Sequence, residues 1–366
     1  MTEAARQISA RLASHGPLSF ARFMELALYC PLYGYYEKKR DTTGKRGDFY
    51  TSVSVGSLFG ELLAFQFAAW FTAAVPGGAT RLRLAEAGAH DGRLARDILT
   101  WFKRQRPALF EHMEYLILEP SERRQSWQEA ELKEFGGKIS WQRDFNHEPA
   151  SVWPCYTILF SNELLDAFPV HRLGWDAGAK AWFEWGVTLA DERFAWTRLP
   201  VPTCELKPLL DLPAELLAVL PDGFTTELGP AGEKWWHAAA NWLRHGKLLA
   251  LDYGLAAEDF FSPQRAHGTL RAYRHHQLTG NLLTDPGEQD LTAHVNFSAL
   301  RHAGESVGLT TESFTSQAQF LTRIVEQAWQ EKNNFGLWTP EHSRQFQTLT
   351  HPNHLGRAFR VLVQSR

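Results

Sequence analysis

The sequence predicts an α/β fold with a doubly wound parallel sheet, a helical region before it and an antiparallel β insertion within it. From Arg81 onward, short apolar runs alternate with amphipathic helical stretches, which is typical of parallel βαβ units. Residues 171–205 instead alternate apolar and polar positions around turn residues, which indicates antiparallel hairpins. Before residue 81, apolar residues recur at helical spacing.

The composition favours an ordered, enzyme-sized chain. The 366 residues are 44% hydrophobic, so a large core can form. The 38 basic and 41 acidic residues nearly cancel, so we expect no nucleic-acid partner. No apolar run is long enough for a signal peptide or a membrane span, so we expect no membrane insertion and a cytoplasmic location. The alternative is an organellar presequence, with Arg6 and Arg11 on an amphipathic helix, but Glu3 favours an ordinary first helix. The three cysteines lie far apart and predict neither a zinc cage nor a disulfide framework.

The N-terminal region, residues 1–80, is predicted to be helical with one ordered loop. We expect helices at residues 4–14, 20–29 and 58–74, with Ser19 as the N-cap of the second. The core is expected at residues 81–170 and 233–366, with a β-rich insertion at 171–232 and a polar inserted segment at 262–292.

Seven segments of the core carry the strand pattern. In chain order they are RLRLAEA, EYLILE, KISWQRDF, YTILFSN, KLLALDYG, LTTESFT and FRVLVQSR. Helices are expected after the first strand, between the second and third, near residues 233–243 and 297–304, and once more before the last strand.

The turn between the first strand and its helix, Glu86-Ala-Gly88-Ala-His90-Asp-Gly92, is the strongest local signal of a ligand site. Small residues there let backbone N–H groups approach a ligand, and the helix N-terminus favours a carboxylate or phosphate. The alternative is a turn without a ligand. No GKS or GKT motif is present, so a nucleoside with an amino-acid tail fits better than a pyrophosphate. This favours S-adenosylmethionine over NAD as the cofactor.

Acidic residues at the ends of the next two strands are candidate cofactor ligands. Glu119 closes the second strand, where a carboxylate would meet the two hydroxyls of a ribose; the alternative is a solvated strand tip. Asp144 closes the third strand and is a candidate acceptor for an adenine amine, with a local capping role as the alternative.

A polar motif, Ser161-Asn162-Glu163-Leu-Leu-Asp166, follows the fourth strand. Groups at the carboxyl end of a central strand face the crevice where open α/β sheets bind ligands. Asn162, Glu163 and Asp166 are therefore candidate catalytic residues, which would hold a cationic substrate nitrogen and orient its lone pair toward a sulfonium methyl. In the alternative interpretation, Asn162 caps a following helix and Glu163 lies in its first turn.

Two further polar clusters, Asp252-Tyr253-Gly254 and the segment from Gly287 to His294, have no role that the residues alone assign. His294 is interpreted as a structural residue in preference to a base. No HExxH or comparable ligand spacing is present, so no metal site is predicted.

The sequence resembles the MidA family, whose mitochondrial members are complex I assembly-factor protein arginine methyltransferases. The matching segments run in order along nearly the whole chain: PLSFARFMELALYCPLYGYY, GDFYTSVSVGSLFGELLA, EAGAHDGRLARDIL, FSNELLDAFPVHR, LLALDYG, GTLRAY, DPGEQDLTAHVNFSAL and FRVLVQSR. The resemblance implies a Rossmann-like, seven-strand class I methyltransferase core with S-adenosylmethionine as methyl donor. It matches Glu86, Gly88 and Gly92 to the cofactor turn, Glu119 to the ribose-binding acid, and Asn162-Glu163 to the post-strand motif.

The GDFYTS segment, in which Asp48 and Thr51 are the expected cofactor-binding residues, corresponds to a family signature near the cofactor. The chain departs from the family at the cofactor turn, because His90 stands where members usually have the central glycine of Gly-Pro-Gly-x-Gly. A residue with a side chain is disfavoured there if the turn needs a positive φ, and the imidazole would lie near the methionine moiety. In the alternative, His90 contacts the cofactor carboxylate.

We therefore expect an S-adenosylmethionine-dependent protein methyltransferase that acts on an arginine of a protein client, such as a subunit of respiratory complex I. The alternatives are a small-molecule methyltransferase, a non-catalytic assembly factor that binds a client on the same fold, and, more weakly, a nicotinamide oxidoreductase. Four tryptophans of the insertion are expected to pack its own core in preference to forming a partner surface; they are Trp175, Trp182, Trp185 and Trp196.

Overall fold

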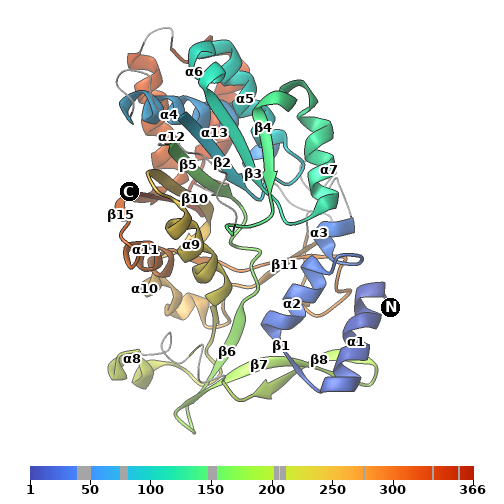
Figure 1. Ribbon diagram of the computed structural model, residues 1–366. Helices are drawn as coiled ribbons and strands as arrows, with labels where there is room; N and C mark the ends of the chain where they lie inside the picture. The colour runs from blue at the N-terminus through green and yellow to red at the C-terminus, as the bar shows by residue number, and fades with distance from the viewer. Residues whose placement is uncertain are drawn as a thin grey trace.

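The protein is built on one mixed central sheet (Figure 1). The computed structural model describes all residues except 39–50, 75–80, 147–154, 202–205, 207–211, 275–276, 332–333 and 353–354. In spatial order the sheet runs β15 (Thr310–Ser316), β16 (Phe359–Ser365), β10 (Gly246–Leu255), β5 (Cys155–Asn162), β2 (Arg81–Ala87), β3 (Met113–Leu118) and β4 (Ile139–Gln142). A short further strand, β14 (Val295–Asn296), pairs with the end of β10.

The order of the strands creates a crevice at the middle of the sheet. The strands from β10 to β4 are parallel, and β16 is antiparallel to both of its neighbours. The chain enters at β2, moves outward through β3 and β4, and returns to β5 on the other side of β2. Connections therefore diverge at the carboxyl ends of β2 and β5, where open α/β sheets bind ligands. The predicted fold class is confirmed, and each predicted strand segment forms one strand of this path.

Helices cover both faces of the sheet. One apolar layer comprises α4 (Leu58–Ala74), α5 (Arg93–Gln105), α12 (Gln317–Gln330) and α13 (Pro340–Thr350), and the other comprises α9 (Pro230–Trp242) and α11 (Phe297–Glu305). Side chains alternate along β2, so that Leu84 joins the first layer and Ala85 the second. Further helices lie in other connections: α6 (Pro107–His112), α7 (Glu122–Glu131), α8 (Ala214–Val219) and α10 (Ala257–Phe260). The sequence predicted one helix before the last strand, but the structure has two, α12 and α13, because Pro340 begins a second helix.

The N-terminal helices pack against the β insertion, in the lower part of Figure 1. They are α1 (Glu3–His15), α2 (Phe20–Tyr29) and α3 (Tyr35–Lys38). The insertion and the short N-terminal strand β1 (Leu18–Ser19) form one antiparallel sheet. Its order is β1, β7 (Ala181–Ala190), β6 (His171–Asp176) and β9 (Thr225–Leu228), with β8 (Arg193–Leu199) paired to β7. Ile8 and Phe23 share an apolar cluster with Val187. Ser19 caps α2 as predicted, because its hydroxyl accepts the N–H of Arg22.

The tryptophans of the insertion pack against other aromatic rings. Trp175 is 5% exposed and pairs with Trp182, with 5.2 Å between their ring centroids. Trp196 contacts Trp185 and packs against Phe20 of α2 at 5.2 Å. These four rings therefore pack within the insertion and against the N-terminal helices.

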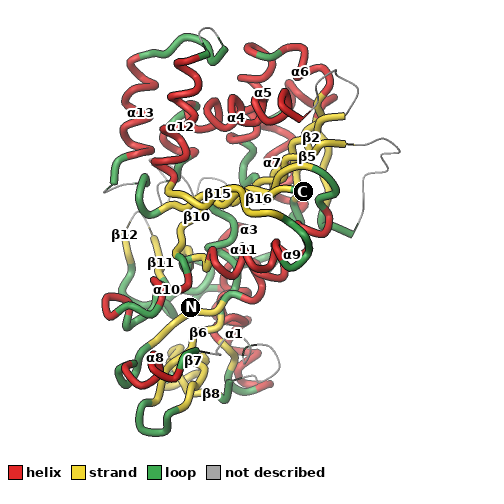
Figure 2. The backbone as a smooth tube through the Cα atoms, turned by 90° about the vertical axis from the view of Figure 1, so that its left-hand side faces the viewer, coloured by secondary structure: helices red, strands yellow, loops and turns green. Residues whose placement is uncertain are grey.

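A small third sheet connects the two larger ones. It consists of β12 (Gln277–Leu278), β11 (Arg271–Arg274) and β13 (Asp290–Thr292). Figure 2 shows β11 and β12 between the central sheet above and the insertion below. Within the described ranges, no helix combines the length and the apolar character needed to cross a membrane.

Candidate active site

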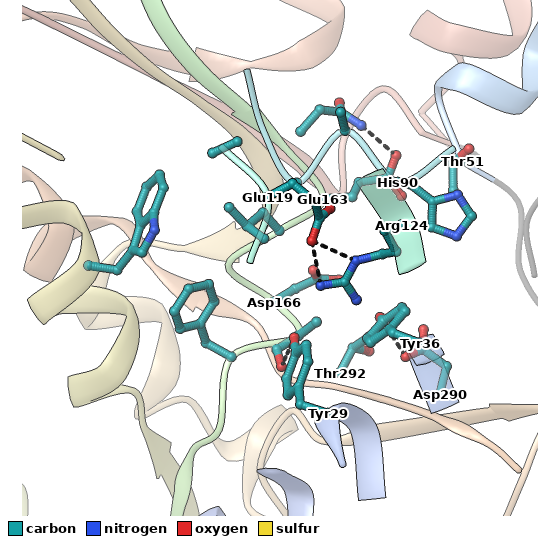
Figure 3. Close-up of a pocket in the computed structure, with 18 of the residues that line it drawn as sticks. Tyr29, Tyr36, Thr51, His90, Glu119, Arg124, Glu163, Asp166, Asp290 and Thr292 are labelled. Atoms are coloured by element: carbon teal, nitrogen blue, oxygen red, sulfur yellow. Dashed lines mark hydrogen bonds and ion pairs between the residues drawn. The ribbon is translucent and has the colours of Figure 1, made fainter. Parts of the chain in front are cut away.

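A cavity of about 1030 Å³ lies at the carboxyl ends of β2, β3 and β5 (Figure 3). Most of the predicted site residues line it: Thr51, Glu86, Gly88, His90, Glu119, Asp144, Asn162, Glu163 and Asp166. Gly92 does not line the cavity but serves as the N-cap of α5. Asp48 lies outside the described residues. Residues predicted separately at the ends of different strands are thus gathered around one space.

The turn between β2 and α5 forms one wall of the cavity. Gly88 and Gly92 have φ angles of 75° and 87°, and a Cβ atom on Gly88 would lie 2.8 Å from Cδ1 of Leu164. The left-handed conformation therefore favours glycine at position 88, and an added Cβ would displace the side chain of Leu164. His90 also has a positive φ, 47°, and its Nδ1 lies 3.9 Å from Oδ1 of Asp91. The turn thus does place its non-glycine residue in the left-handed region, which histidine adopts more readily than most residues.

Glu86 is buried beneath this turn and bonded to a tyrosine. Glu86 is only 2% exposed, and the hydroxyl of Tyr115 donates to Oε2 of Glu86 at 2.6 Å. Burial raises the pKa of Glu86 to about 7, against the opposing effect of the Tyr115 hydrogen bond. Glu86 therefore changes charge near neutral pH at the wall of the cavity.

Glu119 is held by several donors at the end of β3. Its Oε1 accepts the N–H of Ser121 at 2.9 Å and the Nε–H of Arg124 at 2.9 Å. Its Oε2 accepts from Nε2 of Gln128 at 3.0 Å. The alternative of a solvated strand tip is wrong, because Glu119 is 2% exposed. Sequence reasoning missed Arg124, which lines the cavity although it comes from the first turn of α7.

Thr51 and Asp144 lie at two other edges of the cavity. Thr51 exchanges hydrogen bonds with Ser54, and the N–H of the next residue, Ser52, donates to Oε1 of Glu163 at 3.2 Å. The end of the GDFYTS segment thus contacts the post-β5 motif. Asp144 lies two residues beyond the end of β4, where it is exposed and accepts the N–H of Asn146 at 2.9 Å.

The motif after β5 forms turns, not a helix. Residues 163–170 contain no helix before β6 begins, so the interpretation of Asn162 as a helix cap is wrong. Glu163 has a φ of 50°, and its Oε1 accepts from Nδ2 of Asn162 at 3.1 Å. This left-handed turn points the motif toward the cavity. Burial and the charge of Asp252 raise the pKa of Glu163 to about 8.

Carboxylates from three segments of the chain gather near Glu163. Asp166 is 6% exposed, and burial together with the charges of Asp252 and Asp290 raises its pKa well above the ordinary value. Oδ2 of Asp252 accepts the backbone N–H groups of Leu164 and Leu165 at 3.1 and 2.8 Å. These donors stabilise the negative charge of Asp252. The polar clusters around Asp252 and Asp290, unassigned in the sequence, thus contribute to the same site.

Two tyrosines that sequence reasoning missed form the facing wall. The hydroxyl of Tyr29 donates to the carbonyl of Ala167 at 2.9 Å, and that of Tyr36 donates to Oδ1 of Asp290 at 2.8 Å. Their rings stack with 5.6 Å between centroids. Burial raises the pKa of both phenols, so both stay neutral. They lie in the segment YCPLYGYY, whose aromatic residues are evident in the sequence, but no local pattern assigns them to partners 138 and 254 residues away.

His294 lines the cavity on the side of the small sheet. Burial and the charges of Arg271 and Arg265 lower its pKa to about 4, so it is neutral at physiological pH. Its Nδ1 is buried without a hydrogen-bond partner among the described residues. No three His, Cys, Asp or Glu side chains in the described part of the chain are grouped so that they could hold a metal ion.

Known proteins resemble this chain over most of its length. It is 28% identical to the Drosophila melanogaster protein named "Protein arginine methyltransferase NDUFAF7 homolog, mitochondrial", over 98% of this chain and 84% of that protein. It is also 28% identical to the human "Protein arginine methyltransferase NDUFAF7, mitochondrial", over 83% of this chain and 69% of that protein.

A solved structure with the same fold contains a ligand. It is a crystal structure of a Burkholderia thailandensis protein described as a "likely methyl transferase" and bound to S-adenosyl-homocysteine. The sequences are 29% identical, the TM-score is 0.82, and the alignment covers 99% of this chain and 92% of that one. A native structure from the same organism aligns with a TM-score of 0.80 at 28% identity, over 99% of this chain and 91% of that one.

The relatives contradict the cytoplasmic location expected from the sequence. Both the Drosophila and the human protein are named as mitochondrial. The expectation rested on the lack of an apolar signal, which bears on secretion and membrane insertion but does not separate the cytoplasm from other compartments.

The family match covers most of the elements that build the cavity. Residues 62–315 match the model of a family described as "Putative S-adenosyl-L-methionine-dependent methyltransferase". This range includes the β2–α5 turn, Glu119 and the motif after β5. The chain therefore belongs to this family of S-adenosylmethionine-dependent methyltransferases, as the resemblance of its motifs implied.

Proposed function

We propose that this chain transfers the methyl group of S-adenosylmethionine to an arginine side chain of a protein client. The observation that carries the proposal is the acidic half of the cavity, where Asp166 and Asp290 lie near the rings of Tyr29 and Tyr36, and Glu163 lies farther along the wall, toward His90 (Figure 3). The names of the relatives support the same acceptor, since both are called protein arginine methyltransferases. We further propose a subunit of respiratory complex I as the client, by analogy with the mitochondrial members of the family.

The residues of the other half of the cavity fit the cofactor. Gly88 brings the backbone to the wall, and the N-terminus of α5 favours the carboxylate of an amino-acid tail. Glu86 lies where it can attract the ammonium group of that tail, and Glu119 where it can accept from ribose hydroxyls. When bound, S-adenosylmethionine supplies a methyl group on a positively charged sulfur, which is an electrophile for a nitrogen lone pair.

The acidic half fits a guanidinium group. A guanidinium is a planar cation with five N–H donors, and carboxylates accept them in pairs. Asp166 and Asp290, which are 6% and 1% exposed, offer such acceptors in a site from which water is largely excluded. The neutral tyrosine rings provide flat faces for stacking, and a cation over an aromatic face is attracted to it. The charge, shape and depth of this half therefore all favour arginine.

Glu163 is the proposed proton acceptor. The arginine nitrogen that bonds to the methyl group must lose a proton, while the carbon–sulfur bond breaks and its electron pair stays on sulfur. A base with a pKa near the working pH is the most effective, and burial with the charge of Asp252 raises the pKa of Glu163 to about 8. Asn162 and the N–H of Ser52 both donate to Oε1 of Glu163, which fixes the carboxylate relative to the substrate nitrogen.

The test is methyl transfer from labelled S-adenosylmethionine to arginine-containing peptides from complex I subunits, with the modified residue located by mass spectrometry. The native protein should methylate arginine and leave matched lysine peptides unmodified. Glu163→Gln and Asp166→Asn should lower the transfer rate at least about 100-fold while S-adenosyl-homocysteine still binds. Glu258→Gln, on the exposed face of α10, is the control and should act as the native protein does. Methylation of a small molecule but of no peptide would overturn the proposal.

A second function, client binding without methyl transfer, is motivated by His90. Its φ of 47° places a side chain in the cofactor turn, where the family usually has glycine. Calorimetric titration with S-adenosyl-homocysteine separates the two functions. Binding by the native protein supports the enzyme; binding that appears only in His90→Gly supports a binding protein that has lost its cofactor.

A further inference from the structure

Arg124 is a buried cation that lies between two carboxylates at the cavity wall. Its Nε and Nη2 atoms each lie 2.9 Å from Oε1 of Glu119, and its Nη1 lies 3.3 Å from Oε1 of Glu37 on α3. The side chain is 11% exposed. Figure 3 shows its guanidinium projecting into the cavity between Glu119 and Tyr36. Of its two carboxylate partners, Glu119 lines the cavity and Glu37 does not.

The position of Arg124 on its helix is electrostatically unfavourable. It occupies the third residue of α7, where the helix dipole favours anions and disfavours cations. The two carboxylates offset this cost, and they leave the three-residue group with a net negative charge. A cationic cofactor is therefore not repelled. A neutral residue at position 124 would need no carboxylates to offset the helix dipole.

Glu119 cannot accept both hydroxyls of a ribose in this arrangement. A carboxylate accepts about four hydrogen bonds, about two at each oxygen. Oε1 already accepts the N–H of Ser121 and the Nε–H of Arg124, with Nη2 of Arg124 at ion-pair distance, and Oε2 accepts from Gln128. One acceptor position on Oε2 remains. The second hydroxyl of a vicinal diol must therefore find a different partner.

Arg124 has donors to offer that partner. Among the described residues, its Nε–H donates to Glu119 and its Nη1 and Nη2 each form one ion-pair contact, so these contacts involve at most three of the five N–H groups. A hydroxyl oxygen is an acceptor as well as a donor, so it can receive a remaining N–H while the neighbouring hydroxyl donates to Oε2 of Glu119.

We propose that Arg124 is a cofactor-binding residue, which donates to a ribose hydroxyl oxygen while Glu119 accepts from the neighbouring hydroxyl. The inference rests on the proposed function, because it takes S-adenosylmethionine as the ligand. Glu37 is the positioning residue of this pair: it is 7% exposed, it holds Nη1 of Arg124, and its other oxygen accepts the hydroxyl of Ser121 at 2.8 Å. The site recognises a vicinal diol on a nucleoside.

The experiment removes the guanidinium and the hydroxyls separately and together. S-adenosyl-homocysteine and its 2′-deoxy and 3′-deoxy analogues are titrated by calorimetry into the native protein, Arg124→Lys and Arg124→Met. Loss of the contacted hydroxyl should weaken binding to the native protein about 10-fold, as expected for a hydrogen bond to a charged group. The same loss should cost both variants about twofold or less, because their partner for that hydroxyl is already gone. Arg124→Lys keeps a positive charge beside Glu119 and Glu37, so this variant should remain folded.

Arg123→Lys is the matched control. Arg123 precedes Arg124 on α7 and donates to the carbonyl of Glu37, but it does not line the cavity. It should give native affinities for all three ligands. Glu37→Gln should weaken the binding of S-adenosyl-homocysteine and reduce the difference in affinity between this ligand and its deoxy analogue. A general loss of stability would not reduce that difference.

Two results would overturn the inference while leaving the proposed function intact. One is an equal loss of affinity for all three ligands in Arg124→Lys, which would mean that Arg124 acts without touching the ribose. The other is native affinity in Arg124→Met. A native protein that binds no S-adenosyl-homocysteine would instead refute the proposed function, and this inference with it.

Discussion

The carboxylate of Asp252, at the end of β10, holds the backbone of Leu165, which lies 87 residues earlier in the chain, at 2.8 Å. The same Oδ2 accepts from Leu164 at 3.1 Å, and Oδ1 accepts the N–H of Tyr253 at 2.8 Å. Asp252 is 0% exposed, so it serves the site without touching a ligand. It fixes the turn that presents Glu163 and Asp166 to the cavity.

Replacement of Asp252 by Asn should lower the free energy of unfolding. An amide has one oxygen, so its NH₂ group must face either the N–H of Tyr253 or the N–H groups of the turn, and one set of donors is left unsatisfied. The expected cost is about 1–3 kcal/mol. Denaturant unfolding measures it, with Asp259→Asn on exposed α10 as the control. Equal stability of Asp252→Asn and the control would show that the turn does not depend on this carboxylate.

Gly88→Ala should disrupt the cofactor turn. The new Cβ would lie 2.8 Å from Cδ1 of Leu164, and φ is 75°. The left-handed conformation alone costs a non-glycine residue roughly 1–2 kcal/mol. We expect loss of S-adenosyl-homocysteine binding, which a second change, Leu164→Ala, restores in part because it removes the clash but not the backbone strain. Gly136→Ala is the control, since its Cβ would meet open space. Unchanged calorimetric affinity in Gly88→Ala would contradict this role of the turn.

The parts of this site that local sequence patterns reveal are those that follow a strand directly. Gly88, Glu119 and Glu163 each stand where a strand period ends, and all three line the cavity. The periodicity of apolar residues also predicted the strands of the central sheet, and the residue type before the second helix predicted the cap at Ser19. The helix expected after Asn162 is absent, because Glu163 adopts a left-handed φ of 50° that a helix cannot continue.

The facing half of the site could not be predicted in this way. Tyr36 and Asp290 meet across 254 residues of sequence, through packing of α3 against the small sheet. Arg124 is part of an ordinary charged helix in the sequence, and its role depends on Glu37, which comes from a different helix. Such pairings follow from tertiary packing, which periodicity and turn chemistry do not encode.

The folded protein should lose stability with rising pH because of Glu163. Its ordinary pKa is 4.5 and its pKa in the folded protein is about 8, owing first to burial and then to the charge of Asp252. Between these values the folded state holds a proton that the unfolded state has released, so the free energy of unfolding falls as pH rises. The stabilisation is fully present below about 4.5 and fully lost above about 8.

Glu163→Gln removes this titration. Each unit of pKa shift corresponds to about 1.4 kcal/mol, so the variant should be more stable than the native protein at pH 9 and show a shallower decline of melting temperature between pH 5 and 9. Thermal unfolding across this range measures the difference, and Glu258→Gln should follow the native curve. Parallel curves for the native protein and Glu163→Gln would contradict the assignment.

Cofactor affinity should depend on pH through Glu86. Burial raises the pKa of Glu86 to about 7, so its carboxylate is charged above that pH and neutral below it. Only the charged form attracts the ammonium group of the cofactor tail, so affinity for S-adenosyl-homocysteine should fall as pH decreases from 8 to 6. Tyr115 donates to the charged form at 2.6 Å and so lowers the pKa; Tyr115→Phe should therefore move the midpoint of this fall to higher pH. Calorimetry should find no such fall in Glu86→Gln, and a fall that persists there would assign the titration to a different group.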